Sequence, residues 1–200
     1  MKWLISVIIL SFLFINACSK APIQKIDAAQ KSLETAKNAD AETYAPDALK
    51  AAEDKAKALE DEITVQKGKF FKSYKLTRQL VSQLQELADN AKNQAARMKE
   101  TAKTNAQNAL NTAEAALKEA RETLNAASQG RKSTLDVAGL TIEIDSATTE
   151  FEQAKKDLTE GKFTDAKNRA LDVKEKTEKI KTDVQTAINV RKATPKFRRH

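Results

Sequence analysis

Residues 106–127 read AQNALNTAEAALKEARETLNAA, and this stretch decides the fold class. Ala and Leu alternate along it at steps of three and four residues. The positions are Ala106, Leu110, Ala113, Leu117, Ala120, Leu124 and Ala127. This spacing places all seven side chains on one face of an α-helix. Two apolar residues in every seven form the narrow seam of a coiled coil or helical hairpin. Because small Ala alternates with Leu, we expect a second, antiparallel helix to pack closely against this stretch.

The same spacing runs through the rest of the chain. Five further segments carry one stripe each: residues 26–36, 45–63, 80–98, 140–158 and 163–187. Only four Gly and three Pro interrupt the 200 residues, which argues against an all-β fold with its many turns. The sequence therefore predicts an all-α fold of elongated, antiparallel helical hairpins of the coiled-coil type. Two such hairpins are expected to pack along one long central helix.

Two near-identical tetrapeptides mark turns between the helices. They are Lys67-Gly68-Lys69-Phe70 and Glu160-Gly161-Lys162-Phe163. In each, Gly is expected to adopt the left-handed conformation that ends the preceding helix. The Phe that follows is expected to fold back onto the apolar seam. We expect the aromatic residues near the turns to plug the ends of the bundle, with a ligand pocket as the alternative. These residues are Tyr44, Phe70, Phe71, Tyr74, Phe151 and Phe163.

No comparable break occurs between Phe70 and Ala127, so we expect one helix of about 60 residues there. The stripe changes phase between Met98 and Ala106, where two steps of four residues adjoin. Such a stutter locally unwinds a supercoil. A helix break near residues 101–105 is the alternative, because the Asn and Thr residues there have weaker helix propensity.

Chemically reactive side chains are scarce. Cys18 is the only Cys and His200 the only His. These counts argue against a disulfide framework, a Cys/His zinc site and a Ser-His or Cys-His catalytic pair. We therefore expect a protein that is not an enzyme and has no metal or cofactor. The acidic groups Glu53-Asp54 and Glu60-Asp61-Glu62 lie among lysines, and solvated ion pairs explain them better than a metal or acid-base site.

The N-terminal segment is typical of an export signal. Lys2 precedes an apolar run of thirteen residues, Trp3 to Ile15, which is too short to span a bilayer. Ile15-Asn16-Ala17-Cys18 then resembles the lipobox of bacterial lipoproteins. The resemblance implies cleavage between Ala17 and Cys18, a diacylglycerol on the sulfur of Cys18 and an acyl group, such as palmitate, on its new amine. An ordinary secretory signal with a stray cysteine and an uncleaved membrane anchor are the alternatives.

The residue after the lipobox bears on location. In enterobacterial-type sorting, an Asp directly after the lipidated Cys favours retention in the inner membrane. This chain has Ser19 at that position, which resembles lipoproteins of the outer membrane. We expect a lipid-anchored protein of the bacterial outer membrane, on the periplasmic face rather than the cell surface. One acyl chain anchors a protein only marginally, whereas two or more hold it stably.

A second resemblance covers about residues 22–65. Tyr44-Ala45-Pro46-Asp47-Ala48-Leu49-Lys50-Ala51-Ala52 resembles the Y-x-P-x-x-L-x-x-A signature of a family of small bacterial envelope lipoproteins, built on an Ala-rich helical domain of unknown function. The resemblance implies a periplasmic helical domain, often tethered to or fused with peptidoglycan-binding modules. It brings no catalytic residues, and no such module is visible in this sequence.

The C-terminal segment is the most strongly biased part of the chain. Its five basic residues, with no acid among them, are Arg191, Lys192, Lys196, Arg198 and Arg199. Pro195 is expected to end the preceding helix. The cluster predicts binding to an anionic surface, since basic side chains are attracted to anionic membranes. A frayed, solvated terminus is the alternative.

The segments expected from these observations are a signal peptide (1–17), a lipidated linker (18–22), a first helical hairpin plus long helix (23–128), a loop (129–139), a second helical hairpin (140–190) and a basic tail (191–200). The hypothesis for function is a non-enzymatic envelope lipoprotein. It would be a helical spacer or adaptor bound to peptidoglycan, lipopolysaccharide or an envelope protein. The alternative is a periplasmic carrier or chaperone for lipid or outer-membrane protein clients. The export signal disfavours nucleic acid.

Overall fold

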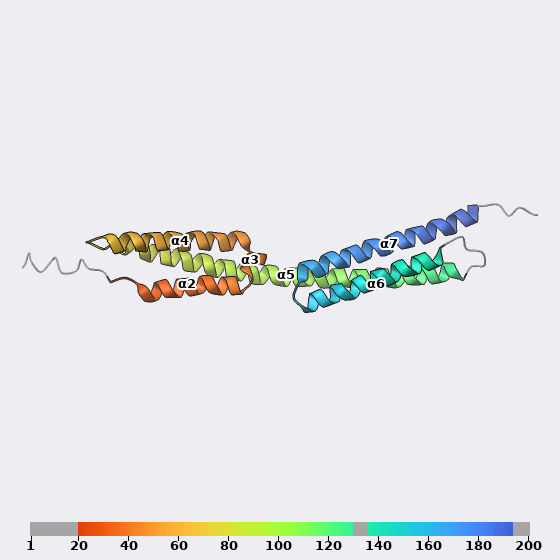
Figure 1. Ribbon diagram of the computed structural model, residues 1–200, viewed down its shortest axis with the longest axis horizontal. Helices are drawn as coiled ribbons and strands as arrows, with labels where there is room; N and C mark the ends of the chain where they lie inside the picture. The colour runs from red at the N-terminus through yellow and green to blue at the C-terminus, as the bar shows by residue number, and fades with distance from the viewer. Residues whose placement is uncertain (1–19, 130–135, 194–200) are drawn as a thin grey trace, which may run out of the picture. The chain divides into compact units, whose positions relative to one another are not determined.

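The computed structural model describes residues 20–129 and 136–193, with side chains as far as Asn189. Within these ranges the chain forms helices α2 to α7 and no strand, which confirms the all-α prediction (Figure 1). No helix there is long and apolar enough to cross a membrane. The chain divides into two compact units: unit 1 ends at Lys99, and unit 2 begins at Glu100.

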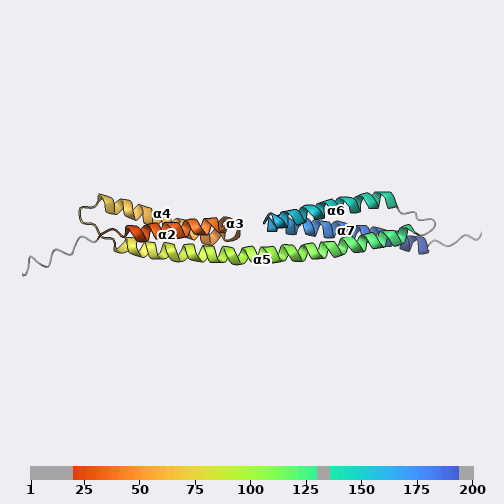
Figure 2. The ribbon, with the colours of Figure 1, turned by 90° about the horizontal axis from the view of Figure 1, so that it is seen from below.

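Unit 1 consists of a helical hairpin packed on the first part of a long helix. The hairpin comprises α2 (Ile23–Asn38), the short α3 (Ala41–Tyr44) and α4 (Pro46–Gly68). Figure 2 shows α2 and α4 lying along α5 (Lys75–Ser128). The helices meet through Ala and Leu side chains in two core clusters, as the stripes predict. Their buried members are Ala29, Ala36, Ala41, Ala45, Leu49, Ala52, Leu59, Leu80, Val81, Leu84, Ala88, Ala91 and Ala95.

The α2–α4 connection is held by backbone geometry and one ion pair. Asp40 adopts a left-handed φ of 58°, which reverses the chain before α3. Its carboxylate accepts a hydrogen bond from Lys99 Nζ at 2.6 Å, which raises the pKa of Lys99 above its ordinary value. Pro46 opens α4 with Asp47 in the first turn, as expected, because Pro needs no partner for a backbone N–H at that position.

Unit 2 repeats the arrangement with α6 (Val137–Thr159) and α7 (Phe163–Ala193) packed on α5 from Glu100 onward. Its core combines small Ala with larger apolar side chains on all three helices, and the two alternate regularly along α5 only. The buried core residues are Ala109, Leu110, Ala113, Leu117, Ala120, Leu124, Ala127, Leu140, Ile144, Ala147, Phe151, Ala154, Ala170, Val173, Ile180 and Val184. The predicted arrangement of two hairpins along one long helix is therefore confirmed, one hairpin in each unit.

Several predicted boundaries differ from the observed ones. Helix α5 has 54 residues and begins at Lys75 rather than Phe70, because residues 69–74 form a turn. The alternative of a break near residues 101–105 is wrong, since α5 is helical throughout that stretch. Met98 is 48% exposed, so the seam does not pass through it.

Unit 2 also differs from its expected limits. Helix α6 begins at Val137 instead of Leu140, because the Asp136 side chain caps it by accepting a hydrogen bond from the Gly139 N–H at 2.9 Å. Helix α7 extends to Ala193, beyond the expected limit of residue 190. Residues 130–135 of the predicted loop lie outside the described residues.

Candidate functional site

The residues predicted to carry the lipid lie outside the described part of the chain. Both Ala17 and Cys18 fall before residue 20. In the basic tail, Lys196, Arg198 and Arg199 follow the last described residue. Arg191 and Lys192 belong to the end of α7, but their side chains are not described. Lipidation and binding to an anionic surface therefore stay predictions.

The first of the two acidic groups of α4, Glu53-Asp54, forms ion pairs on the solvated surface. Glu53 pairs with Lys37 of α2 at 2.7 Å, and Asp54 pairs with Lys50 one helical turn away at 2.9 Å. The hydrogen bond with Asp54 raises the pKa of Lys50 above its ordinary value. Among residues 20–129 and 136–193, no group of His, Cys, Asp or Glu is arranged to hold a metal ion. The ion-pair interpretation fits Glu53 and Asp54, whereas Glu62 of the second group accepts a hydrogen bond from Gln66.

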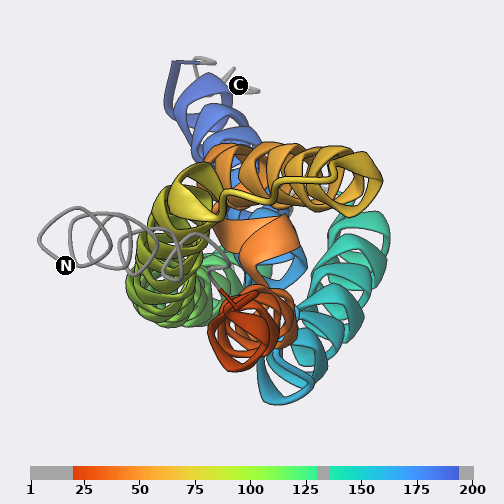
Figure 3. The ribbon, with the colours of Figure 1, turned by 90° about the vertical axis from the view of Figure 1, so that its left-hand side faces the viewer.

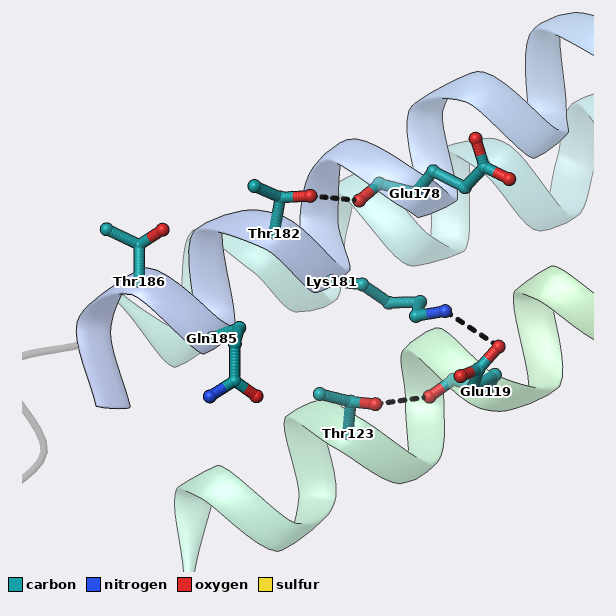
Figure 4. Close-up of a pocket in the computed structure, with 7 residues that line it drawn as sticks. All are labelled: Glu119, Thr123, Glu178, Lys181, Thr182, Gln185 and Thr186. Carbon is teal, nitrogen blue, oxygen red and sulfur yellow. Dashed lines mark hydrogen bonds and ion pairs between the residues drawn. The ribbon is translucent and has the colours of Figure 1, made fainter. Parts of the chain in front are cut away.

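A shallow groove of about 600 Å³ lies between α5 and α7 in unit 2 (Figure 4). Lys181 and Glu119 pair across it at 2.7 Å. The hydroxyls of Thr123 and Thr182 donate to backbone carbonyls of their own helices, at 2.7 and 2.9 Å. Both hydroxyls are thus already paired with backbone oxygens. The residues that line the groove include no Leu, Ile, Val or aromatic residue.

The predicted aromatic plugs divide into two groups. Phe151 and Phe163 are buried in unit 2, at 7% and 9% exposure, as expected for residues that pack in the core. Phe151 also lines two surface grooves between α5 and α6, so the alternative of a ligand pocket stays a prediction there. Tyr44 packs partly buried against the core of unit 1. Phe70 and Phe71, however, are 92% and 81% exposed, so the prediction that they plug the core is wrong. Neither folds back onto the seam, because residues 69–74 carry the chain beyond the ends of α4 and α5.

Phe70 and Phe71 form the centre of the second candidate site, which we call the basic aromatic turn (residues 67–75). Their rings contact each other edge to face, with centroids 5.0 Å apart and planes at 84°. Four exposed lysines flank the pair, at positions 67, 69, 72 and 75. No Asp or Glu occurs between Glu62 and Glu86. None of the four lysines has an ion-pair partner within the described residues.

A buried side chain holds the basic aromatic turn in place. Gln66 is only 4% exposed and donates a hydrogen bond from Nε2 to Glu62 Oε1 at 2.8 Å. Its Oε1 accepts the backbone N–H of Ser73 at 2.9 Å, which ties the far side of the turn to the end of α4. The two phenylalanines lie between these fixed points. The sequence feature that could have indicated this site is the run of basic and aromatic residues without an acid. It was not recognised, because the two similar Gly-Lys-Phe segments led us to expect the same buried Phe in both turns.

No protein-family model, curated protein or solved structure matches the chain. The lipobox and the Y-x-P-x-x-L-x-x-A resemblance therefore stay predictions. In the structure the signature residues have packing roles: Pro46 starts α4, and Leu49 and Ala52 lie in the unit 1 core. These residues that carry the resemblance thus shape the hairpin of unit 1.

Proposed function

We propose that the chain is a non-enzymatic lipoprotein of the bacterial envelope. A lipid on Cys18 would anchor it in the outer membrane, on the periplasmic face, and its helical units would act as a spacer or adaptor. The observation that carries this proposal is the position of the only cysteine. Cys18 stands three residues after an apolar run of thirteen residues, in a segment that resembles a lipobox.

The start of the folded part supports attachment close to the membrane. Helix α2 begins at Ile23, five residues after Cys18. Five extended residues span at most about 17 Å, so the lipid and unit 1 are neighbours whatever path the linker takes. A diacylglycerol together with an N-acyl chain anchors a protein durably, because each buried CH₂ contributes about 0.8 kcal/mol.

The closed cores support a spacer or adaptor over a carrier. In both units the Ala and Leu stripes face one another and are buried, as the four core clusters show. A carrier for lipid or unfolded clients needs a sizeable apolar groove. The groove in Figure 4 is lined by Glu, Lys, Thr and Gln residues, with no large apolar residue among them. Binding of an apolar fluorescent dye at the helical units would favour the carrier.

The envelope component bound by the adaptor is proposed from charge. The tail residues Arg191, Lys192, Lys196, Arg198 and Arg199 would bind an anionic surface, with peptidoglycan, lipopolysaccharide and an acidic envelope protein as candidates. Deleting residues 191–200 should weaken a salt-sensitive association with envelope material. Unchanged association after the deletion would remove the tail from the proposal.

Metabolic labelling tests the anchor directly. Cells that express the full chain are supplied with a palmitate analogue that can be coupled to a dye. We expect the wild-type chain and a Ser19→Ala control to be labelled, and a Cys18→Ser variant to remain unlabelled. A wild-type chain without label, or a labelled Cys18→Ser variant, would exclude lipidation at Cys18.

A further inference from the structure

We propose that the basic aromatic turn docks onto the anionic phospholipid leaflet that holds the lipid anchor. Phe70 and Phe71 would enter the interface between headgroups and acyl chains, and the four lysines would contact lipid phosphates. The choice of this leaflet rests on the proposed function, whereas the affinity of the turn for a phospholipid surface does not. The proposal depends on the exposure, the charge and the position of the turn.

The first argument is the exposure of two adjacent aromatic rings. Phe70 and Phe71 are the two most exposed large apolar residues in the described part of the chain. Their edge-to-face contact makes them a single projecting apolar group. Scattered apolar side chains are normal on a protein surface, but a concentrated apolar patch rimmed by polar residues marks an interaction site.

The second argument is the charge around the rings. All four lysines of the turn are exposed, and within the described residues none has an acidic partner. Lys is a compact point charge on a flexible stem, so it can bind phosphates that lie in no fixed arrangement. Apolar area and attraction to anionic lipids together set the strength of interfacial binding. A turn that is aromatic at its centre and basic at its flanks matches both requirements.

The third argument is position within unit 1. The start of α2 and the basic aromatic turn lie at the same end of this unit, and both face the viewer in Figure 3. The packing agrees, because Ile26 near the start of α2 contacts the same core cluster as Ile63 and Leu80, which flank the turn. Lys20 is the first described residue, and Cys18 precedes it by two residues in the sequence.

Other exposed apolar residues gather at the same end of unit 1. Of the six large, exposed apolar side chains in the described part of unit 1, five belong to the first turn of α2, the end of α4, the turn or the start of α5. They are Ile23, Val65, Phe70, Phe71 and Leu76. The sixth, Met98, lies at the other end of the unit. Docking of the turn would thus add a second attachment point beside the lipid and set unit 1 end-on to the leaflet.

Vesicle sedimentation tests the proposal without the lipid anchor. The probe is the chain from Ser19 to His200, which keeps every described helix and all four core clusters. We expect this chain to bind vesicles of phosphatidylethanolamine and phosphatidylglycerol, to be released by salt and to bind phosphatidylcholine vesicles weakly. A Phe70→Ser/Phe71→Ser variant changes no charge and leaves the basic tail intact. Its vesicle affinity should fall at least about tenfold, because the apolar area that inserts is lost.

The matched control removes two exposed apolar side chains from unit 2. Ile142 and Leu171 are 70% and 45% exposed, so an Ile142→Ser/Leu171→Ser variant should bind vesicles as the wild type does. Circular dichroism should show the same helix content in all three proteins. Wild-type affinity in the Phe70→Ser/Phe71→Ser variant, an equal loss in the control or no binding by the wild type would each overturn the proposal.

A photo-crosslinker at position 70 of the full chain separates the membrane from a protein partner. In intact cells we expect it to label phospholipid. Label found only on protein would overturn membrane docking and assign the turn to a protein partner. Since the vesicle assay uses an unlipidated chain, its failure would leave the anchor at Cys18 in place, and an unlabelled Cys18 would leave the vesicle result in place.

Discussion

The α6–α7 turn of unit 2 takes three residues (160–162), whereas the α4–α5 turn of unit 1 takes six (69–74). In unit 2, Gly161 has a left-handed φ of 79°, and the Lys162 and Gly161 N–H groups donate to the carbonyls of Asp157 and Leu158. This Schellman arrangement reverses the chain at once, so Phe163 starts α7 inside the core. In unit 1, Gly68 is the last residue of α4, and the chain continues in an extended conformation at Lys69.

Electrostatics separates the two turns as well. Lys162 donates a hydrogen bond to Glu160 at 2.7 Å, which lowers the pKa of Glu160 and raises the pKa of Lys162. The basic aromatic turn has no acid to neutralise its lysines. One turn is thus closed in both packing and charge, and the other presents apolar area and positive charge to its surroundings. Two nearly identical tetrapeptides thus form a closed turn in unit 2 and an exposed turn in unit 1, where the residues that precede them differ.

The largest expected difference between the turns is the energetic role of their phenylalanines. Phe163→Ala should lower the free energy of unfolding of unit 2 by about 3 kcal/mol, because it opens a cavity in a packed core. Phe70→Ala should change that of unit 1 by less than about 0.5 kcal/mol, because the ring is already in water. Urea unfolding followed by circular dichroism measures both. Similar losses in the two variants would contradict the structural contrast.

The seam itself could be predicted from periodicity alone. Thr177 falls in the predicted stripe of α7 and is fully buried, since its hydroxyl donates to backbone carbonyls of its own helix. The prediction that Met98 belongs to the apolar stripe of α5 is wrong. The nearest buried residues of the seam are Ala95 and Ala106, and the boundary between the units falls between them. Periodicity therefore located the buried face of α5 on either side of the unit boundary but not at the boundary itself.

The turns show what a short motif cannot predict. Four nearly identical residues suggested one geometry, but a different buried polar side chain precedes each turn, Asp157 in α6 and Gln66 in α4. Their roles depend on partners at Arg169 and Ser73, which only the folded chain brings close. Of the candidate sites, the sequence predicts Cys18 and the basic tail, whereas the exposure of Phe70 and Phe71 required the structure.

The next largest effects should come from these two buried polar anchors. Arg169→Met leaves the Asp157 carboxylate without its cation, which lies 2.8 Å away, and should destabilise unit 2 by about 2 kcal/mol after allowance for the half-exposed Arg169. Gln66→Met leaves the Ser73 N–H without its acceptor and should lower the free energy of unfolding of unit 1 by about 1 kcal/mol. Urea unfolding measures both. Amide exchange adds a local readout, since an unchanged rate at Ser73 in Gln66→Met would argue against the anchor.

Substitution of Gly161 and of Gly68 by Ala should change the free energy of unfolding in opposite directions. Gly161→Ala forces an L side chain into the left-handed region and should destabilise unit 2 by about 1 kcal/mol. Gly68 is helical with open space around the position of a Cβ, so Gly68→Ala should stabilise unit 1 by about 0.5 kcal/mol. Thermal unfolding checks the pair. A destabilised Gly68→Ala variant would imply a left-handed cap there after all.

The smallest expected effect compares two buried threonines. Within the described residues, the Thr77 hydroxyl is buried and has no hydrogen-bond partner, whereas the Thr177 hydroxyl donates to the Val173 carbonyl at 2.9 Å. Thr77→Val should therefore stabilise unit 1 by about 0.5 kcal/mol, because an unpaired buried polar group is costly. Thr177→Val should give no gain. Equal responses in urea unfolding would mean that the Thr77 hydroxyl is satisfied in solution.

Fluorescence tests most directly the contrast between the α6–α7 turn, whose Phe163 is buried, and the basic aromatic turn, which we propose docks onto a membrane. The chain from Ser19 to His200 lacks Trp3, the only tryptophan, so Phe70→Trp, Phe163→Trp and Ile142→Trp variants each carry one reporter. With vesicles of phosphatidylethanolamine and phosphatidylglycerol, the Phe70→Trp emission should shift from that of an exposed to that of an apolar environment. The Phe163→Trp emission should be that of a buried ring, and the Ile142→Trp emission that of an exposed ring, with or without vesicles. An unshifted Phe70→Trp emission would contradict the account.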